Sequence, residues 1–204
     1  MKYKLYKNDF PATLNFKKIV AIDTETMGLN LNRDRLCLVQ VCSGDDIAHL
    51  LQLSKQSKVK PKNLIKLLQN KNITKIFHFG RFDLAMLNKN ICTVIGPVYC
   101  TKIASKLSRT FGAKHGLKDL CKDLLNIELD KFNQTSDWGA KTLSKDQLEY
   151  AAQDVLFLHK LKNELDEILL REGKMDLALE CFESLKTRVK LDLEGFHELD
   201  IFAH

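Results

Sequence analysis

The chain has 204 residues, of which 45% are hydrophobic and 28% are charged. This size and composition fit one globular domain with a substantial core. They exclude a membrane span, because no apolar stretch reaches the roughly 18 uncharged residues that a span requires. The N-terminal segment MKYKLYKNDFP is charged but lacks the following apolar stretch of a secretion signal. We therefore expect a soluble, cytoplasmic protein with no membrane contact.

The six cysteines are scattered along the chain and include no CxxC pair. Neither a zinc cage nor the disulfide framework of a small secreted protein is indicated by this spacing. We expect reduced thiols, which agrees with a cytoplasmic location.

The formal net charge is +6, and residues 55–75 contain seven lysines and no acidic residue. A stretch of this kind is expected of a protein that meets polyanions such as nucleic acid. Lysine also outnumbers arginine throughout the chain, so a general compositional bias explains the excess equally well.

The first half of the chain is expected to form strands. Residues 18–24 are an apolar run, and LCLVQV at 36–41 and DIAHLL at 46–51 follow it at the tight spacing of an antiparallel meander.

Helices alternate with strands farther along the chain. We expect a helix at 61–70, a strand at 74–79, a helix at 81–87, a strand at 98–100, and helices starting near 101 and 116. Three hairpin strands followed by β-α-β units imply a single α/β domain, with a mixed sheet that is flanked by helices.

The longest predicted helix begins at a capping box. Ser144 to Gln147 have the form S-x-x-Q, and apolar residues then recur at helical spacing, so we expect one helix over 145–170. A shorter helix at 175–185 and an apolar tail follow Gly173. The main domain is therefore expected over 1–172, and residues 173–204 are expected to form a C-terminal helix and tail, packed on the same domain.

Two carboxylates, Asp23 and Glu25, stand where the first apolar run ends. Side chains alternate across a strand, so these two share a face while Thr24 points away. Two ionised carboxylates this close repel each other unless a cation lies between them. The alternative is a solvated strand end with two acids placed by chance.

Three further residues extend this acidic pattern. Asp83 follows the strand at 74–79, where chain reversal beside a central strand brings it to the same sheet edge. Tyr150 and Asp154 are four residues apart and therefore share one helix face. Each has an ordinary alternative: a first-turn acid for Asp83, a half-buried tyrosine for Tyr150, and an exposed polar residue for Asp154.

The set D-x-E, D and Y-x-x-x-D, in this order, resembles the DEDD superfamily of 3′-to-5′ exonucleases, in the subgroup whose third motif carries tyrosine. The similarity covers IVAIDTETMGL, KIFHFGRFDLAML and LDKFNQTSDWGAKTLSKDQLEYAAQDVLFL, and the last segment is very similar to bacterial RNase D. The resemblance implies an RNase H-like (DnaQ-like) mixed β-sheet flanked by helices.

RNase D proteins continue into helical nucleic-acid-binding domains, whereas this sequence ends soon after its third motif. Its length, the HGLKDL stretch at 115–120 and the closing DIFAH resemble the short alphaproteobacterial branch known as nanoRNase C, which degrades very short RNAs.

The resemblance also implies a metal-dependent reaction. Two divalent cations about 4 Å apart can generate the nucleophile and stabilise both oxygens of a phosphodiester. Oxygen ligands without a cysteine or histidine cluster favour Mg²⁺ or Mn²⁺. Asp23 is expected to bridge both ions, Glu25 and Asp154 to complete the nucleophile-side ion, and Asp83 to hold the second through water. Tyr150 is expected to orient the attacking water, or to act as the base.

Substrate contacts are implied for residues after the first motif and around the second. Leu29 matches a leucine that related enzymes wedge between the two terminal bases, although a core leucine is an equal alternative. Thr26 and Met27 are expected to line the terminal nucleotide. His78 is a candidate contact to sugar or phosphate, with a histidine satisfied inside the core as its alternative.

Gln134 and Trp138 match RNase D residues near the scissile end. A lone tryptophan is more often a packing residue than a base-stacking platform, so the surrounding QTSDW motif carries this inference.

These observations predict a 3′-5′ exoribonuclease that hydrolyses dinucleotides and other very short RNAs to nucleoside 5′-monophosphates. The alternatives are RNase D-like trimming of longer RNA, action on DNA, and a catalytically inactive RNA-binding relative. An inactive relative predicts the loss of at least one ligand, and all five positions are filled. The apolar tail and the nanoRNase C resemblance imply a homo-oligomer, with an octameric ring as its expected form.

Overall fold

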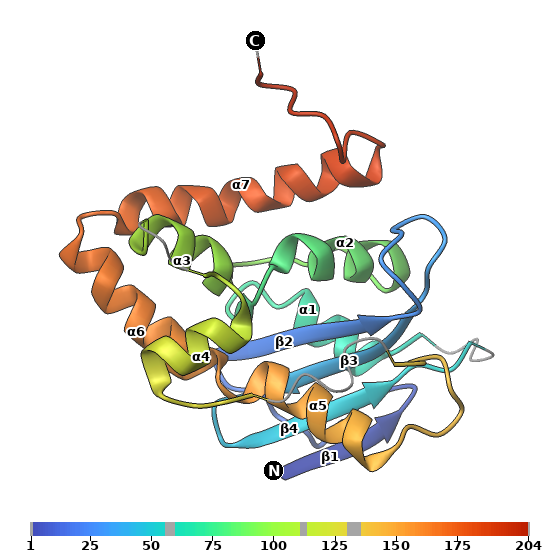
Figure 1. Ribbon diagram of the computed structural model, residues 1–204. Coiled ribbons are helices and arrows are strands. Elements are labelled where there is room, and N and C mark those ends of the chain that lie inside the picture. The colour runs from blue at the N-terminus through green and yellow to red at the C-terminus, as the bar shows by residue number, and fades with distance from the viewer. Residues whose placement is uncertain (1, 56–59, 111–113, 130–135, 204) are drawn as a thin grey trace.

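A six-stranded mixed sheet forms the centre of the molecule, and its strands lie in the order β1-β4-β3-β2-β5-β6 (Figure 1). The computed structural model describes residues 2–55, 60–110, 114–129 and 136–203. The strands are β1 (Lys2–Lys7), β2 (Ile19–Thr26), β3 (Leu36–Cys42), β4 (Ile47–Gln52), β5 (Thr74–Phe77) and β6 (Val98–Cys100).

The strand pairing confirms the predicted mixed sheet. Strands β2, β3 and β4 form an antiparallel meander, while β5 adds to β2 and β6 adds to β5 in parallel. All seven residues of β3 are buried, as expected for a central strand covered on both faces. The expected fold class is therefore correct.

Strand β1 was not predicted from the sequence. Its segment KYKLYK has only partly buried side chains and pairs in parallel with β4 at the sheet edge. Its two partly buried side chains, Tyr3 and Tyr6, are three residues apart, which is not the spacing of two by which a strand is recognised. Its partner lies 45 residues away in register, as the pair Lys2 and Ile47 shows.

Helices cover both faces of the sheet. They are α1 (Lys62–Leu68), α2 (Gly80–Asn90), α3 (Thr101–Ser108), α4 (Leu117–Leu125), α5 (Lys145–Leu156), α6 (Leu158–Arg171) and α7 (Met175–Leu193). Helix α5 crosses β1 to β4, whereas α2 packs against β2, β3 and β5 on the other side (Figure 1). None of the helices in the described ranges is long and apolar enough to cross a membrane.

The single helix predicted over 145–170 is instead two helices, α5 and α6, which meet at Phe157. The capping box at Ser144 is present as expected. Helix α5 packs on β1 to β4, whereas α6 packs mainly on α3 and α4 and also contacts β2 and β5. The apolar periodicity continues through both helices, so it does not predict the change in direction between them.

The C-terminal helix α7 is longer than the predicted 175–185 and packs on α2, α3 and β6. The buried Asp192 accepts hydrogen bonds from Arg81 at 2.6 and 2.7 Å and pairs with Arg188 at 3.0 Å. The pair between Arg81 and Asp192 holds the last turns of α7 against the start of α2, while Arg188 joins Asp192 within α7. The chain then extends away from the body of the molecule (Figure 1).

Candidate active site

A cleft of about 640 Å³ opens where β2 ends. It brings together all five predicted catalytic residues and five of the six predicted substrate contacts. Its lining includes Asp23, Glu25, Thr26, Met27, Leu29, His78, Asp83, Trp138, Tyr150 and Asp154. The sixth predicted contact, Gln134, lies outside the described residues.

Three carboxylates converge at the centre of this cleft. Asp23 and Glu25 project from one face of β2, and Asp154 reaches them from α5, which packs on that face. One oxygen from each carboxylate lies within 4.8 Å of the others. The alternation of the strand and the packing of α5 together build the acidic cluster.

Asp83 approaches from the opposite face of the sheet. It lies in the first turn of α2, and its Oδ1 accepts a 2.6 Å hydrogen bond from the Thr24 hydroxyl. Thr24 thus points away from Asp23 and Glu25 as expected, and there it holds the fourth acid. Burial raises the pKa of Asp83 to about 7, although the Thr24 hydrogen bond opposes this rise.

Burial and mutual repulsion make the ionised cluster costly. Burial, followed by the charges of neighbouring acids, raises the pKa values of Asp23 and Glu25 well above their usual range. The same causes raise the pKa of Asp154 to about 8. Lys102 is the one cation among the described residues that line the cleft. Oxygen donors with excess negative charge are the ligand set that a hard divalent cation prefers.

Gln40 supports the cluster and was not identified from the sequence. It lies opposite Asp23 in the β2/β3 register, and its Nε2 donates a 3.1 Å hydrogen bond to Asp23 Oδ2. The Oε1 of Gln40 is buried without a partner among the described residues. A glutamine inside the apolar run LCLVQV was the available signal, since a buried amide needs a polar partner.

Tyr150 lies one helical turn before Asp154 on α5 and borders the cleft. Its ring centroid is 6.2 Å from that of Trp138, which is only 3% exposed. Trp138 therefore packs behind Tyr150 and offers no open face for base stacking. Burial and the nearby acids raise the pKa of Tyr150 above its usual value, so its hydroxyl stays protonated at neutral pH.

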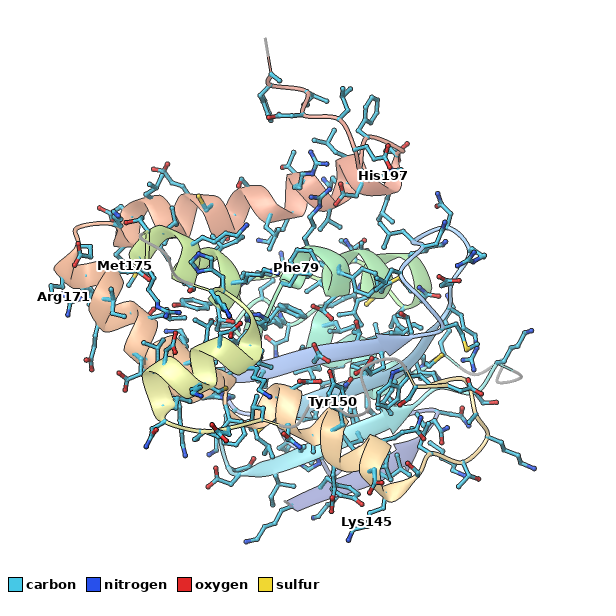
Figure 2. The ribbon with its side chains drawn as sticks, viewed as in Figure 1. Phe79, Lys145, Tyr150, Arg171, Met175 and His197 are labelled. Atoms are coloured by element: carbon cyan, nitrogen blue, oxygen red, sulfur yellow. The ribbon has the colours of Figure 1, made fainter. Side chains whose placement is uncertain are left out.

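Phe79 forms part of the opposite wall and was also missed. It precedes α2 with a φ of +64°, a conformation that is rare for a bulky residue, and it leaves 47% of its surface exposed. Lys102 Nζ lies 4.3 Å from its ring centroid. Phe79 and Tyr150 appear on the two sides of β2 in Figure 2. An exposed aromatic ring in a strained conformation is a feature of binding sites.

His78 lies at the cleft, where it contacts Thr101 at the junction of β6 and α3. Its Nδ1 lies 2.9 Å from the Thr101 hydroxyl. Burial lowers the pKa of His78 to about 3, with Lys102 contributing in the same direction, so the imidazole is neutral at neutral pH. His78 can therefore take part in hydrogen bonds with a substrate, but not in an ion pair.

The loop after β2 presents Met27 and Leu29 to solvent. Leu29 is 83% exposed and Met27 is 51% exposed, which rules out the core alternative for Leu29. A Cβ on Gly28 would lie 2.3 Å from Asp34 Oδ2, so the loop depends on glycine there. Asp34 also accepts the backbone N–H of Asn30 at 2.9 Å. These contacts hold an apolar side chain at the rim of the cleft.

The fold and the acidic cleft together define a nuclease of the exonuclease class. The family model of 3′-5′ exonuclease domains matches residues 7–170, and the chain belongs to this family.

Within this family, the chain is similar to NrnC from Brucella melitensis over its full length. The structure of NrnC with bound Mg²⁺ has 52% identical residues and a TM-score of 0.94, with 100% of each chain covered. The structure of NrnC bound to pGG has 53% identical residues and a TM-score of 0.95, and covers 100% of this chain and 99% of that one.

Curated relatives named ribonuclease D are more distant. The one from Acidiphilium cryptum is 32% identical over 161 residues, which are 79% of this chain and 40% of the relative. The chain therefore spans about two fifths of the length of these ribonucleases.

Neutralising one acid is predicted to stabilise the metal-free protein. Asp154 has a higher pKa in the folded than in the unfolded state, so its contribution to stability is lost as pH rises toward about 8. Asp154→Asn should raise the Tm in chelator at pH 8 by about 2–4 °C for each kcal/mol of relieved repulsion. The gain should shrink at pH 5, where the native carboxyl is protonated.

The control is Asp146→Asn, which neutralises an exposed acid in the first turn of the same helix. An equal rise in Tm for both variants, or no rise for Asp154→Asn, would contradict the proposed repulsion. Thermal unfolding followed by circular dichroism, with and without Mg²⁺, provides the measurement.

Proposed function

We propose that this protein is a metal-dependent 3′-5′ exoribonuclease that hydrolyses dinucleotides and other very short RNAs to nucleoside 5′-monophosphates. The observation that carries the proposal is the convergence of Asp23, Glu25 and Asp154 within 4.8 Å in a cleft that also contains Asp83. An acidic cleft repels a phosphodiester unless cations are present. The arrangement therefore supports cation-dependent chemistry on a phosphate.

These four carboxylates would hold two divalent cations, Mg²⁺ or Mn²⁺. The donor set fits them, because it consists of hard oxygen atoms, and Lys102 is the one cation among the described residues that line the same cleft. Asp23 is proposed as the shared ligand, Glu25 and Asp154 as the ligands on the nucleophile side, and Asp83 as the ligand of the second ion through water. When bound, such ions supply an activated water and stabilise the charges of the reacting oxygens.

Tyr150 is proposed to position the attacking water. An unperturbed phenol has a pKa of about 10, so a tyrosine is poorly suited to remove a proton at neutral pH. Its ring lies beside that of Trp138, and Tyr150 lines the cleft together with Asp154. Tyr150 thus provides an oriented hydroxyl beside Asp154.

The remaining cleft residues are proposed to hold the nucleotide. The exposed side chains of Leu29, Met27 and Phe79 offer apolar contacts for bases, and the neutral His78 offers a hydrogen bond to sugar or phosphate. Thr26 is 8% exposed and its hydroxyl donates to Gly28 O at 2.5 Å, so it acts by shaping the loop. Trp138 supports Tyr150, and Gln134 stays a proposed contact by resemblance.

The choice of a very short RNA rests on the similarity to NrnC, which has been solved with pGG bound. Trimming of longer RNA 3′ ends is the main alternative, because the relatives named ribonuclease D share the same domain. Action on DNA is the second alternative, because carboxylates and metals contact only the phosphate.

We also propose that the chain assembles into a closed homo-oligomer, with an octameric ring as the expected form. Part of the C-terminal region, 173–204, folds back on the domain through α7. The apolar residues that it leaves exposed are Leu177, Leu179, Phe196, Leu199, Ile201 and Phe202. Exposed apolar side chains gathered at one end of a chain are typical of an interface.

A cytoplasmic location is consistent with the six free cysteines.

The activity is tested by comparing substrates under one condition. The purified protein should convert a labelled RNA dinucleotide to 5′-monophosphates in Mg²⁺, faster than a seven-nucleotide RNA or a DNA duplex. Asp23→Ala should lower the turnover rate at least about 10³-fold, because it removes a ligand that both ions would share. Robust hydrolysis in excess chelator would contradict the dependence on divalent cations. A preference for the longer RNA would favour the trimming alternative.

Leu29→Ala tests the rim of the cleft. Because Leu29 is 83% exposed, its truncation should leave the Tm unchanged while dinucleotide turnover falls by about tenfold, the effect of roughly 1.4 kcal/mol in the transition state. Leu170→Ala is the matched control, since Leu170 is 65% exposed and lies on α6. Equal turnover in the two variants would contradict the proposed contact between Leu29 and the substrate.

The tail is tested by the molar mass in solution. Light scattering should give eight times the chain mass of 23.4 kDa for the native protein. Ile201→Ser combined with Phe202→Ser should lower this mass, whereas Leu170→Ser should not. A monomeric native protein, or an unchanged mass in the double variant, would rule out this role of the tail.

A further inference from the structure

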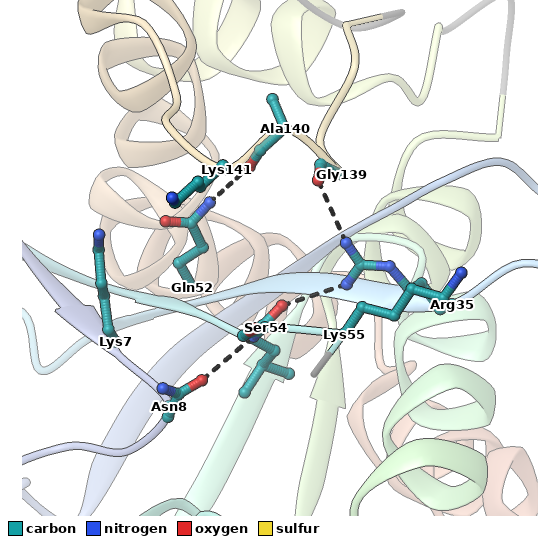
Figure 3. Close-up of a pocket in the computed structure, with 10 residues that line it drawn as sticks. Lys7, Asn8, Arg35, Gln52, Ser54, Lys55, Gly139, Ala140 and Lys141 are labelled. Carbon is teal, nitrogen blue, oxygen red and sulfur yellow. Dashed lines mark hydrogen bonds between the residues drawn. The ribbon is translucent and has the colours of Figure 1, made fainter. Parts of the chain in front are cut away.

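A second hollow, of about 390 Å³, lies beside the catalytic cleft and is lined by cations (Figure 3). Four basic side chains face it from separate parts of the chain: Lys7 at the end of β1, Arg35 before β3, Lys55 after β4, and Lys141 before α5. No carboxylate is among the described residues that line it. We refer to this hollow as the basic pocket.

Among the described residues, no carboxylate pairs with the cations of the basic pocket. Within the described ranges, none of these four side chains forms an ion pair. Arg35 instead donates to the backbone carbonyls of Leu53 at 3.1 Å and Gly139 at 3.4 Å. Four like charges in one concavity repel one another, and an anionic ligand would relieve this repulsion.

Hydrogen bonds between distant segments hold the walls of the basic pocket (Figure 3). Gln52 Nε2 donates to the carbonyl of Ala140 at 2.9 Å, and the backbone N–H of Ser54 donates to Asn8 Oδ1 at 3.2 Å. With the Arg35 contacts, these bonds tie β1, β4 and the segment 139–141 together. The concavity is therefore part of the folded frame.

The basic pocket and the catalytic cleft share a wall. Gly139 lines the basic pocket, and a Cβ on it would lie 2.2 Å from the sulfur of Met27, which lines the cleft. The backbone N–H of Met27 also donates to the carbonyl of Arg35 at 3.1 Å. An anion in the basic pocket would thus lie one layer of residues away from a substrate in the cleft.

We propose that the basic pocket binds the phosphate group of a nucleotide ligand. Its guanidinium and ammonium groups suit phosphate oxygens, and its volume is within the range of small-ligand sites. Two sources carry this chemistry: a separate mononucleotide, and the 5′ part of an RNA whose 3′ end occupies the cleft. The second source rests on the proposed function, whereas phosphate binding itself does not require catalysis.

The test measures binding in chelator, where the metal-free acids of the cleft repel phosphate and no turnover occurs. The probes are guanosine 5′-monophosphate, guanosine, and a 5′-phosphorylated seven-nucleotide RNA. The double variant Lys55→Gln and Lys141→Gln should weaken binding of a phosphorylated probe by about tenfold. For the RNA, it should also lower the slope of log affinity against log salt by about 1.4, since each contact to a single strand contributes about 0.7.

The matched control is the double variant Lys18→Gln and Lys160→Gln, which neutralises two exposed lysines outside the basic pocket, one just before β2 and one on α6. A loss confined to the RNA identifies the strand as the source, and a loss for guanosine 5′-monophosphate identifies the nucleotide. The proposal would be overturned if the variant Lys55→Gln and Lys141→Gln bound both phosphorylated probes as tightly as the control variant does. It would also be overturned if guanosine bound as tightly as guanosine 5′-monophosphate. Dinucleotide hydrolysis in Mg²⁺ is assayed separately, so its absence would count against the proposed function and not against the basic pocket.

Discussion

Repulsion among the partly buried carboxylates Asp23, Glu25 and Asp154 and the buried Asp83 at the end of β2 is the constraint on which the rest of the structure depends. Asp23 and Glu25 are delivered by the central strand of the sheet, and Asp154 and Asp83 are brought to them from opposite faces. Burial raises the pKa of each of these acids. Ionised acids so close are unfavourable without cations, and the folded frame must therefore hold them together against their repulsion.

Neutral hydrogen bonds help to supply that frame. Gln40 donates to Asp23 across the β2/β3 register, and Thr24 donates to Asp83 across the interface between sheet and helix. Both partners lie on or beside β2, so the positions of the acids are set by the sheet rather than by a mobile loop. Rigid placement is what metal ligation and in-line attack on a phosphate require.

Apolar side chains and basic side chains lie in different places around the acids, and each kind suits a different part of a nucleotide. Exposed apolar groups, Leu29 and Phe79 among them, border the cleft. Cations that form no ion pair with a described residue line the basic pocket, on the other side of the wall that Met27 and Gly139 share. Negative charge where metals bind and positive charge nearby form a gradient along which a phosphate-bearing ligand can be oriented. Lys75, in contrast, is fully buried and donates to the carbonyls of Asn70 and Ile95, so part of the lysine-rich stretch 55–75 serves the core.

The sequence by itself determined the meander, the strand and helix alternation, and the acids that meet in the cleft, because strand alternation and helical spacing are local properties. It did not reveal β1, Gln40 or Phe79. An edge strand, a cross-strand partner and an exposed ring acquire their roles only from residues far away in the chain. The bend at Phe157 and the basic pocket belong to the same category: the first depends on what α5 and α6 pack against, and the second on four segments that meet only when the sheet is complete.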